Sequence, residues 1–266
     1  LHDMWAITGH NIWGYDKITQ QINSSIHQIE ETPTLKWNNT KHLFNLKSKL
    51  YQDINIVINP VSFWLKKELE KSILGNQRIE VIYNGINNKV FRQYNKINSR
   101  KELGLPINKK IITFLSNGGK NNPQKGWAYT DEIITKMTRR EEVVFLCIGG
   151  NNYDKDKRNN IIYIPYINET KKIAKYYSAS DMFLFTSLAE NFPLVTLEAM
   201  ACGTPVVSFD VAGVKEALDH KKNGYLAKYK DIDDVLRGIE FILNLTRENI
   251  NKISNFSIKK INDHFT

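Results

Sequence analysis

The sequence predicts an α/β fold with parallel sheets, and two observations support this prediction. The first is a set of short apolar segments rich in β-branched residues, which is typical of strands buried on both faces. The second is that segments with helical periodicity separate them, as in doubly wound domains. The predicted strands are residues 54–58, 78–83, 110–116, 142–150, 160–165, 181–187 and 205–209, with a short strand at 224–227.

These strands are distributed unevenly along the chain. Residues 110–243 hold six of them, which is enough for a complete Rossmann-like domain. Residues 1–83 hold too few for a domain of their own and match the second half of one. The segment 84–99 lacks periodicity and is expected to connect the two parts. The expected divisions are an incomplete amino-terminal domain over 1–88, a complete domain over 89–243, and a carboxyl-terminal helix within 244–266.

Start and stop signals place helices between the strands. Asn168 precedes a periodic segment, so we expect a helix to begin directly after it. Pro193 opens the segment PLVTLEAMAC and Gly203 closes it, which is the asymmetry typical of helix ends. This helix follows the strand 181–187 and precedes the strand 205–209.

Composition and charge narrow the class of protein. The chain has 266 residues, of which 41% are hydrophobic, so a real core is expected and global disorder is not. Its net charge is +9, and the excess is spread along the chain rather than gathered in a tail. Such a surface favours phosphate-bearing partners such as nucleotides, anionic lipid or nucleic acid, and it is equally consistent with general solubility.

The two cysteines, Cys147 and Cys202, lie in apolar segments without a second Cys or a His at metal-ligand spacing. We expect two buried free thiols, no metal site and a reducing compartment. No apolar run approaches the ~18 residues of a membrane span, and no signal peptide is visible. The chain begins at Leu1 without Met, so we expect sequence upstream of it. The expected reducing compartment suggests a cytoplasmic location.

Two carboxylates stand in the otherwise mostly apolar segment AENFPLVTLEAMACGTPVV. Glu190 lies in the loop at the carboxyl end of a predicted strand, where open parallel sheets bind ligands. The helix that follows offers free backbone N–H groups to an anion such as a pyrophosphate. Glu198 lies in its second turn and can lean back toward the same edge. The residues predicted to surround the phosphates at this terminus are Asn191, Phe192, Pro193 and Leu194.

The chemistry of a carboxylate suggests a sugar rather than a phosphate as its partner. A vicinal ribose diol offers two hydroxyl donors to one carboxylate. We therefore hypothesise that Glu198 holds a ribose and that Glu190 faces a donor sugar. The alternative for Glu198 is an ordinary, partly exposed helix glutamate, because two acids eight positions apart are common.

The string ENFPLVTLEAMACGTPVV resembles the signature of family-4 (group 1) retaining glycosyltransferases of the GT-B fold. The likeness extends over residues 84–243, in VIYNGINNKVF, NNPQKGW and NGYLAKYKDIDDV. It implies two Rossmann-like domains that face each other across a cleft, the amino-terminal one binding the acceptor and being incomplete here. It also implies that Glu190 faces the donor sugar, that Glu198 contacts the nucleotide ribose, and that the helix after Leu243 packs back toward the amino-terminal domain.

The same resemblance assigns the donor phosphates to the loop before residue 127. Lys125 matches the lysine that binds them, and Gly118, Gly119 and Gly126 allow close approach to an anion. The family usually has an arginine upstream of this lysine. Here Lys120 can replace it as a charge but not as a bidentate fork, and the alternative for Lys120 is a solvated loop residue.

Two further positions are compared with the family. Asn191 stands where a glycine is usual, which leaves the phosphate contacts there open. The opening LHDMW resembles a strand-end His-Asp of bacterial members, so His2 is a candidate to lie near donor sugar and acceptor. A structural histidine is the alternative.

The predicted function is retaining transfer of a sugar from a nucleoside-diphosphate sugar to a glycan or lipid-linked acceptor, with no metal or other cofactor. The resemblance implies same-face attack, with the leaving phosphate taking the acceptor proton. Glu190 as a covalent nucleophile is the alternative mechanism. A GT-B relative that epimerises the sugar nucleotide, or does not turn it over, is an alternative function.

A rival from another class is a protein that binds nucleic acid or an anionic surface through its basic groups. The segment 35–51 is the one candidate, because Lys36, Lys41, Lys47 and Lys49 alternate there with apolar residues. We interpret it as a core-packing helix with a solvated basic face, and expect no nucleic-acid partner. Peripheral contact with an anionic membrane at the inner face of the cell membrane is the weaker option.

Overall fold

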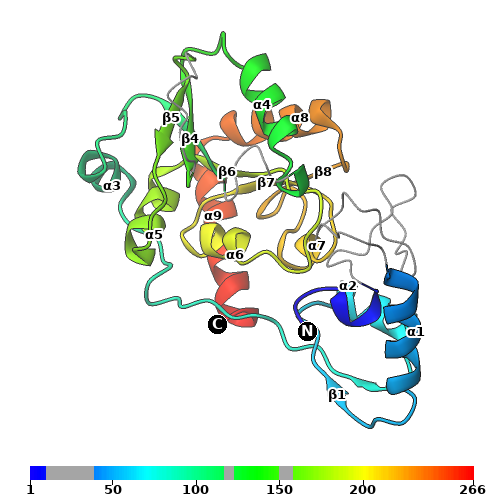
Figure 1. Ribbon diagram of the computed structural model, residues 1–266. Coiled ribbons are helices and arrows are strands. Elements are labelled where there is room, and N and C mark those ends of the chain that lie inside the picture. The colour runs from blue at the N-terminus through cyan, green and yellow to red at the C-terminus, as the bar shows by residue number, and fades with distance from the viewer. Residues whose placement is uncertain (10–38, 117–122, 150–157) are drawn as a thin grey trace. The chain divides into compact units, whose positions relative to one another are not determined.

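The computed structural model describes residues 1–9, 39–116, 123–149 and 158–266 (Figure 1). The chain separates into two compact units. Unit 1 comprises Leu1–Tyr83 with Ala189–Phe192, and unit 2 comprises Asn84–Leu188 with Pro193–Thr266.

Unit 2 is built on one parallel sheet of six strands in the order β5-β4-β3-β6-β7-β8. The strands predicted between residues 110 and 227 are therefore confirmed as one doubly wound sheet. The strand order reverses between β3 and β6, and at such a switch point the connections leave in opposite directions and open a crevice. The strands are β3 (Lys110–Leu115), β4 (Val143–Ile148), β5 (Ile161–Ile164), β6 (Met182–Phe185), β7 (Val206–Phe209) and β8 (Gly224–Ala227).

Helices cover both faces of this sheet (Figure 1). Helices α4 (Trp127–Lys136) and α8 (Ile232–Leu243) pack on the face that receives Phe145 and Cys147 of β4. The alternate residues Leu146 and Ile148 face the opposite layer, where α5 (Thr170–Ala179) packs. Both faces of β4 are thus apolar, which explains why its sequence shows no polar alternation.

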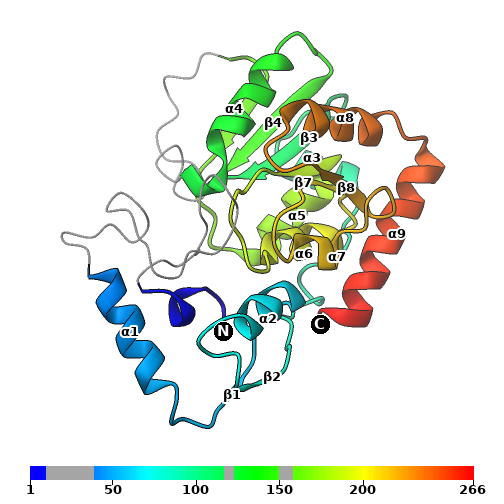
Figure 2. The same ribbon diagram turned by 90° about the vertical axis from the view of Figure 1, so that its right-hand side faces the viewer.

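The helix α6 (Leu194–Ala201) ends as the sequence predicts. Pro193 occupies the N-cap position, and Gly203 follows the helix with a φ of 73°, in the left-handed region that favours glycine. The start predicted for α5 is one residue early, because Glu169 and not Asn168 occupies the N-cap. Helix α6 lies on the same side of the sheet as α5 (Figure 2).

Three further helices complete unit 2. Helix α3 (Lys96–Glu102) begins within the segment expected to be an irregular connection, with the Asn95 side chain accepting from the N–H of Asn98 at 3.0 Å. Helix α7 (Val214–Ala217) is a single turn, and α9 (Arg247–His264) packs along α6 (Figure 2). The hydroxyl of Ser254 donates to the carbonyl of Gly203 at 2.6 Å and joins α9 to the end of α6.

Unit 1 holds less regular structure. Its strands β1 (Val57–Ile58) and β2 (Arg78–Ile79) form a parallel pair of two residues each, shorter than the segments 54–58 and 78–83 that predict them. Its helices are α1 (Thr40–Leu50) and α2 (Phe63–Glu70), with a 3-10 turn, η1, at Trp5–Ile7. Within the described parts of the chain, no helix is long and apolar enough to cross a membrane.

Helix α1 corrects the interpretation of segment 35–51, of which residues 35–38 lie outside the described chain. Leu46 is 45% exposed and Leu50 is 59% exposed, whereas Lys47 is buried. The Lys47 ammonium donates to the carbonyls of Trp5 at 2.6 Å and Thr8 at 2.9 Å. A core-packing helix with a solvated basic face was the wrong interpretation, because carbonyls of the segment 5–8 draw one lysine of that face inward.

Candidate functional site

Polar side chains gather in unit 2 at the carboxyl ends of β3 and β6, on the two sides of the switch point. Ser116 follows β3, and Thr186 and Ser187 follow β6. These three residues and Lys125 line a small cavity of about 30 Å³. Lys125 therefore lies at the edge of the sheet where doubly wound folds bind their ligands, and its contact with the donor phosphates stays a prediction.

Lys125 ends a 3-10 turn, η3 (Pro123–Lys125), that is fastened to the segment after β6. The N–H of Leu188 donates to the carbonyl of Gln124 at 2.7 Å, and the Ser187 hydroxyl donates to the same carbonyl at 3.2 Å. These two hydrogen bonds hold the turn η3 against Ser187 and Leu188, which follow β6. The lysine stem starts from a fixed point at the end of β6, although its flexible side chain sits on a turn rather than in a helix.

Gly126 is required for this contact, for a reason that differs from the one predicted. Its φ is 66°, and a Cβ atom at this position would lie 1.9 Å from the carbonyl oxygen of Thr186. The glycine lets two backbone segments approach each other, where the sequence had suggested close approach to an anion. The predicted partners Gly118, Gly119 and Lys120 lie outside the described residues.

Glu198 is half-buried on α6 and accepts a hydrogen bond from the Tyr177 hydroxyl at 3.2 Å. Burial raises the pKa of Glu198 to about 7, although the hydrogen bond from Tyr177 acts in the opposite direction. Burial also raises the pKa of Tyr177, so the phenol remains a donor. Near neutral pH the Glu198 carboxyl is therefore divided between its neutral and ionised forms. Glu198 is partly exposed, as the alternative interpretation also expects, and its contact with a ribose stays a prediction.

The segment Ala189–Phe192 groups with unit 1 and contains Glu190, which is 8% exposed. Its neighbour Asn191 is buried, and the Asn191 amide nitrogen donates to the backbone carbonyl of His2 at 2.6 Å. The Asn191 amide oxygen is buried without a partner in the described chain. The predicted site residues Asn191 and His2 are thus in contact, but this contact involves the His2 backbone and not its imidazole.

His2 differs from its expected place at the end of a strand, whereas its role near the donor sugar and acceptor stays a prediction. Its side chain is exposed, and it precedes the turn η1 instead of ending a strand in the described residues. Glu190 and Glu198 belong to different compact units, and the structure describes each by itself.

The remaining predicted donor-binding residues, Phe192 to Leu194, are consecutive in the sequence and lead into α6. Phe192 is buried and packs on Tyr83, with ring centroids 5.1 Å apart. Pro193 occupies the N-cap without a side-chain cap on the first turn, and Leu194 is 41% exposed. An uncapped first turn leaves backbone N–H groups available to an anion.

Three contributors were missed by the sequence analysis. Tyr177, Gln124 and Ser187 position Glu198 and Lys125 through the hydrogen bonds described above. Ser187 could have been found, because it ends a predicted strand at the ligand-binding edge. Nothing in the local sequence singles out Tyr177 or a backbone carbonyl at Gln124. Among the described residues, no cluster of three or more His, Cys, Asp or Glu side chains could hold a metal ion.

Both cysteines are buried and free, as the sequence predicts. Burial raises the pKa of Cys202 to about 12. This thiol therefore remains protonated near neutral pH and is a poor nucleophile.

A comparison with known protein families matches residues 95–259, more than half of the chain, to the glycosyl transferases group 1. The chain belongs to this family. The match includes all six strands of the unit 2 sheet, together with Lys125, Glu190 and Glu198. The family resemblance inferred from ENFPLVTLEAMACGTPVV is confirmed.

Relatives within this group extend the comparison. An uncharacterised glycosyltransferase of Methanocaldococcus jannaschii is 31% identical over 181 residues, which cover 63% of this chain and 45% of that protein. The N-acetyl-alpha-D-glucosaminyl L-malate synthase of Bacillus anthracis is 28% identical over 188 residues, covering 67% of this chain and 48% of that protein. The chain thus spans less than half of the length of these two relatives.

Solved structures show the same fold. Sucrose-phosphate synthase from Thermosynechococcus elongatus has a TM-score of 0.72 at 20% identity, over 86% of this chain and 59% of that one. The Anabaena protein HepE, in complex with UDP and glucose, has a TM-score of 0.67 at 19% identity, over 84% of this chain and 63% of that one. The predicted α/β fold of the GT-B type is confirmed.

Proposed function

We propose that the chain carries the donor-binding part of a retaining glycosyltransferase, which moves a sugar from a nucleoside-diphosphate sugar to a glycan or lipid-linked acceptor. The observation that carries the proposal is the half-buried Glu198 on α6, a helix whose uncapped first turn follows the ligand-binding end of β6. Family membership supports it, and so does the fold shared with a protein solved with UDP and glucose.

Lys125 and the first turn of α6 are the groups assigned to the diphosphate. The ammonium at the end of β6 would offset the negative charge that grows on the leaving group. The backbone N–H groups at the start of α6 add donors that need no reorganisation during the reaction. Lys125 and the first turn of α6 lie at the same edge of one sheet, so a single diphosphate can contact both.

Glu198 is assigned to the ribose. Hydroxyl donors bind an ionised carboxylate more strongly than a neutral one. Nucleotide binding would therefore favour the ionised form of Glu198, and a proton would leave the site near neutral pH. The Tyr177 hydroxyl occupies one lone pair of the carboxylate, so the ribose takes the remaining ones.

Glu190 is assigned to the donor sugar. Retention would follow from same-face attack, in which the acceptor oxygen bonds to the anomeric carbon, the bond to the diphosphate breaks, and the leaving phosphate takes the acceptor proton. Attack by the Glu190 carboxylate itself is the alternative route to retention.

An acceptor carried on a lipid would bring the protein to a membrane surface. Helix α1 supports such contact, because Leu46 and Leu50 are exposed one turn apart and Lys41 and Lys49 are exposed beside them. Co-sedimentation with anionic vesicles should fall in the double variant Leu46→Ser/Leu50→Ser. Equal co-sedimentation of the variant and the wild type would remove α1 from the proposal.

Titration calorimetry with UDP, GDP and ADP, and with the corresponding sugar nucleotides, tests the role of each residue. Glu198→Ala should weaken the nucleoside diphosphate and the sugar nucleotide alike, by about tenfold, because the ribose is common to both. Glu190→Ala should leave the diphosphate unaffected and impair turnover. Lys125→Ala should weaken the diphosphate but not the nucleoside. The matched controls are the exposed residues Glu248 and Lys171, each changed to Ala.

Two results would contradict the assignments. Equal loss of diphosphate affinity in Glu190→Ala and Glu198→Ala would refute the division between sugar and ribose. A turnover assay that yields isomerised sugar nucleotide instead of transferred sugar would replace glycosyl transfer with epimerisation.

A further inference from the structure

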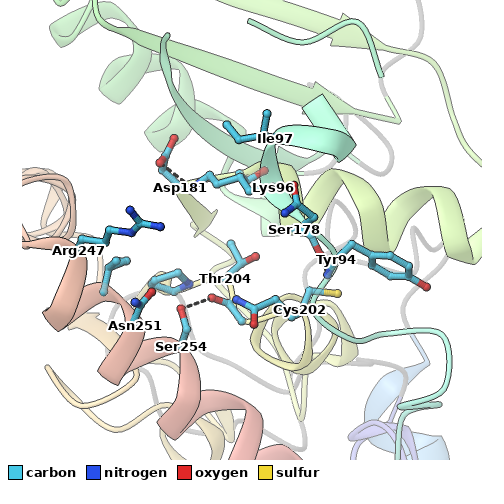
Figure 3. Close-up of a pocket in the computed structure, with 16 residues that line it drawn as sticks. Tyr94, Lys96, Ile97, Ser178, Asp181, Cys202, Thr204, Arg247, Asn251 and Ser254 are labelled. Carbon is cyan, nitrogen blue, oxygen red and sulfur yellow. Dashed lines mark hydrogen bonds and ion pairs between the residues drawn. The ribbon is translucent and has the colours of Figure 1, made fainter. Parts of the chain in front are cut away.

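A second pocket lies in unit 2, at the edge of the sheet opposite to Lys125 (Figure 3). Asp181 and Pro205, which directly precede β6 and β7, form part of its wall. The rest comes from the segment that leads into α3, the ends of α5 and α6, and the first turns of α9. Its volume is about 730 Å³, within the range of small-molecule sites.

The charge of this pocket is positive. The carboxylate of Asp181 accepts from the Lys96 ammonium at 2.7 Å, from the Arg100 guanidinium at 2.7 Å, and from the N–H of Ile111 at 2.7 Å. Of the residues that line the pocket, Lys96 and Arg247 carry a positive charge and Asp181 a negative one, so the balance of the lining is 2 − 1 = +1. Arg100 also holds Asp181 but does not line the pocket.

Donors that lack a partner line the same wall. Arg247 and Asn251 lie one turn apart on α9 and point toward the cavity, with Lys96 on the other side (Figure 3). Within the part of the chain that the structure describes, neither Arg247 nor Asn251 has a hydrogen-bond or ion-pair partner. The Lys96 ammonium is paired with the Asp181 carboxylate, which Arg100 shares, so a ligand anion there would be a second acceptor for Lys96.

We propose that this pocket binds a small molecule that carries a phosphate group, at a site separate from the nucleotide site. A phosphate has three terminal oxygens to accept from the Arg247 guanidinium, the Asn251 amide and the Lys96 ammonium, whereas a carboxylate has two. Arg247 offers a guanidinium fork to the phosphate, and Asn251 adds an amide donor. Ile97, Ile250 and Pro205 supply an apolar wall for the rest of the molecule.

Charge reversals on α9 test this site. Arg247→Glu and Lys259→Glu both exchange an exposed cation of this helix for an anion, and only Arg247 lines the pocket. We expect calorimetry with inorganic phosphate and with glucose 6-phosphate to show at least about tenfold weaker binding in Arg247→Glu. Lys259→Glu should change it less than about twofold, and Asn251→Asp should weaken it. UDP binding should be unchanged in all three variants.

The following results would contradict the proposal. Equal effects of Arg247→Glu and Lys259→Glu would overturn the proposal, as would loss of phosphate binding in Lys125→Ala, which would place the anion in the nucleotide site. Acetate that binds as tightly as phosphate would refute the preference of the pocket for phosphate over a carboxylate. Absence of saturable binding of either phosphate probe up to about 10 mM would exclude a site of useful affinity. Thermal unfolding of each variant verifies that it folds.

Discussion

The two compact units bury their apolar side chains to different degrees. In unit 2, β4 and β6 are fully buried, and Phe145 and Phe183 are 0% exposed. In unit 1, Val57 on β1 is 52% exposed and Ile82 is 61% exposed, although Leu65 and Leu69 of α2 are buried. The difference teaches that a six-stranded sheet with helices on both faces closes a core, whereas a pair of two-residue strands cannot.

Polar contacts replace part of that missing core in unit 1. Lys47 holds the segment from Trp5 to Gly9 by donating to carbonyls, with its ammonium 3.7 Å from the centre of the Trp5 ring. Such contacts orient a segment, but each contributes only about 1 to 3 kcal/mol. Unit 2 should therefore be the stable part of the described chain.

The largest expected effect concerns the two units as separate fragments. Residues 84–266 should unfold cooperatively on heating, because they contain the whole six-stranded sheet. Residues 1–83 should show no cooperative transition on their own. Circular dichroism of the two fragments checks this. A sharp transition in the fragment 1–83 would break the comparison.

A pair of phenylalanines should show the difference within the intact chain. Phe183 is 0% exposed and packs edge-on against Tyr177, with ring centroids 5.4 Å apart, whereas Phe63 is 52% exposed. We expect Phe183→Ala to lower the free energy of unfolding by about 3 to 5 kcal/mol and Phe63→Ala by less than about 1 kcal/mol. Urea unfolding of the intact chain, monitored by circular dichroism, measures both, and similar losses would contradict the contrast.

A pair of glycines separates backbone strain from close approach. Gly126 and Gly104 both have a φ of 66°, but a Cβ atom at Gly104 would meet nothing within 4 Å. Gly104→Ala should therefore lower the free energy of unfolding by about 1 kcal/mol, from backbone strain alone. Gly126→Ala should lower it by about 3 kcal/mol and also weaken diphosphate binding, because Lys125 moves. Denaturant unfolding and UDP titration measure the two effects. If both variants lose the same stability, the contact with Thr186 is not what requires Gly126.

The smallest effect depends on pH. The folded-state pKa of Glu198 is about 7, above its ordinary value of 4.5. Its contribution to stability is fully present below about pH 4.5 and is lost as the pH rises through 7, because the folded state keeps the proton longer. Relative to Glu198→Gln, the wild type should lose on the order of 1 to 3 kcal/mol between these values. Thermal unfolding against pH measures this, with Glu248→Gln as the control. Between pH 4.5 and 7, the curves of the wild type and Glu198→Gln should converge or cross. Parallel curves for these two proteins would mean that Glu198 titrates normally.

The sequence by itself determined the sheet of unit 2 and the family. Runs such as VVFLCI and MFLF encode burial on both faces without reference to distant residues, and Pro193 and Gly203 mark the ends of α6 locally. The spacing of Glu190 and Glu198 and the position of Lys125 are likewise readable from short strings. These features could be predicted because each depends on neighbours within a few residues.

The tertiary structure decided the contacts between distant segments. Tyr177 reaches Glu198 across 21 residues, the carbonyl of Gln124 receives the N–H of Leu188, and Lys47 turns inward to Trp5, where its sequence pattern predicted a solvated face. The pocket of Arg247 and Lys96 joins two helices from opposite ends of unit 2. Periodicity records whether a residue is buried but not which partner buries it, because that partner is chosen only when the chain closes on itself.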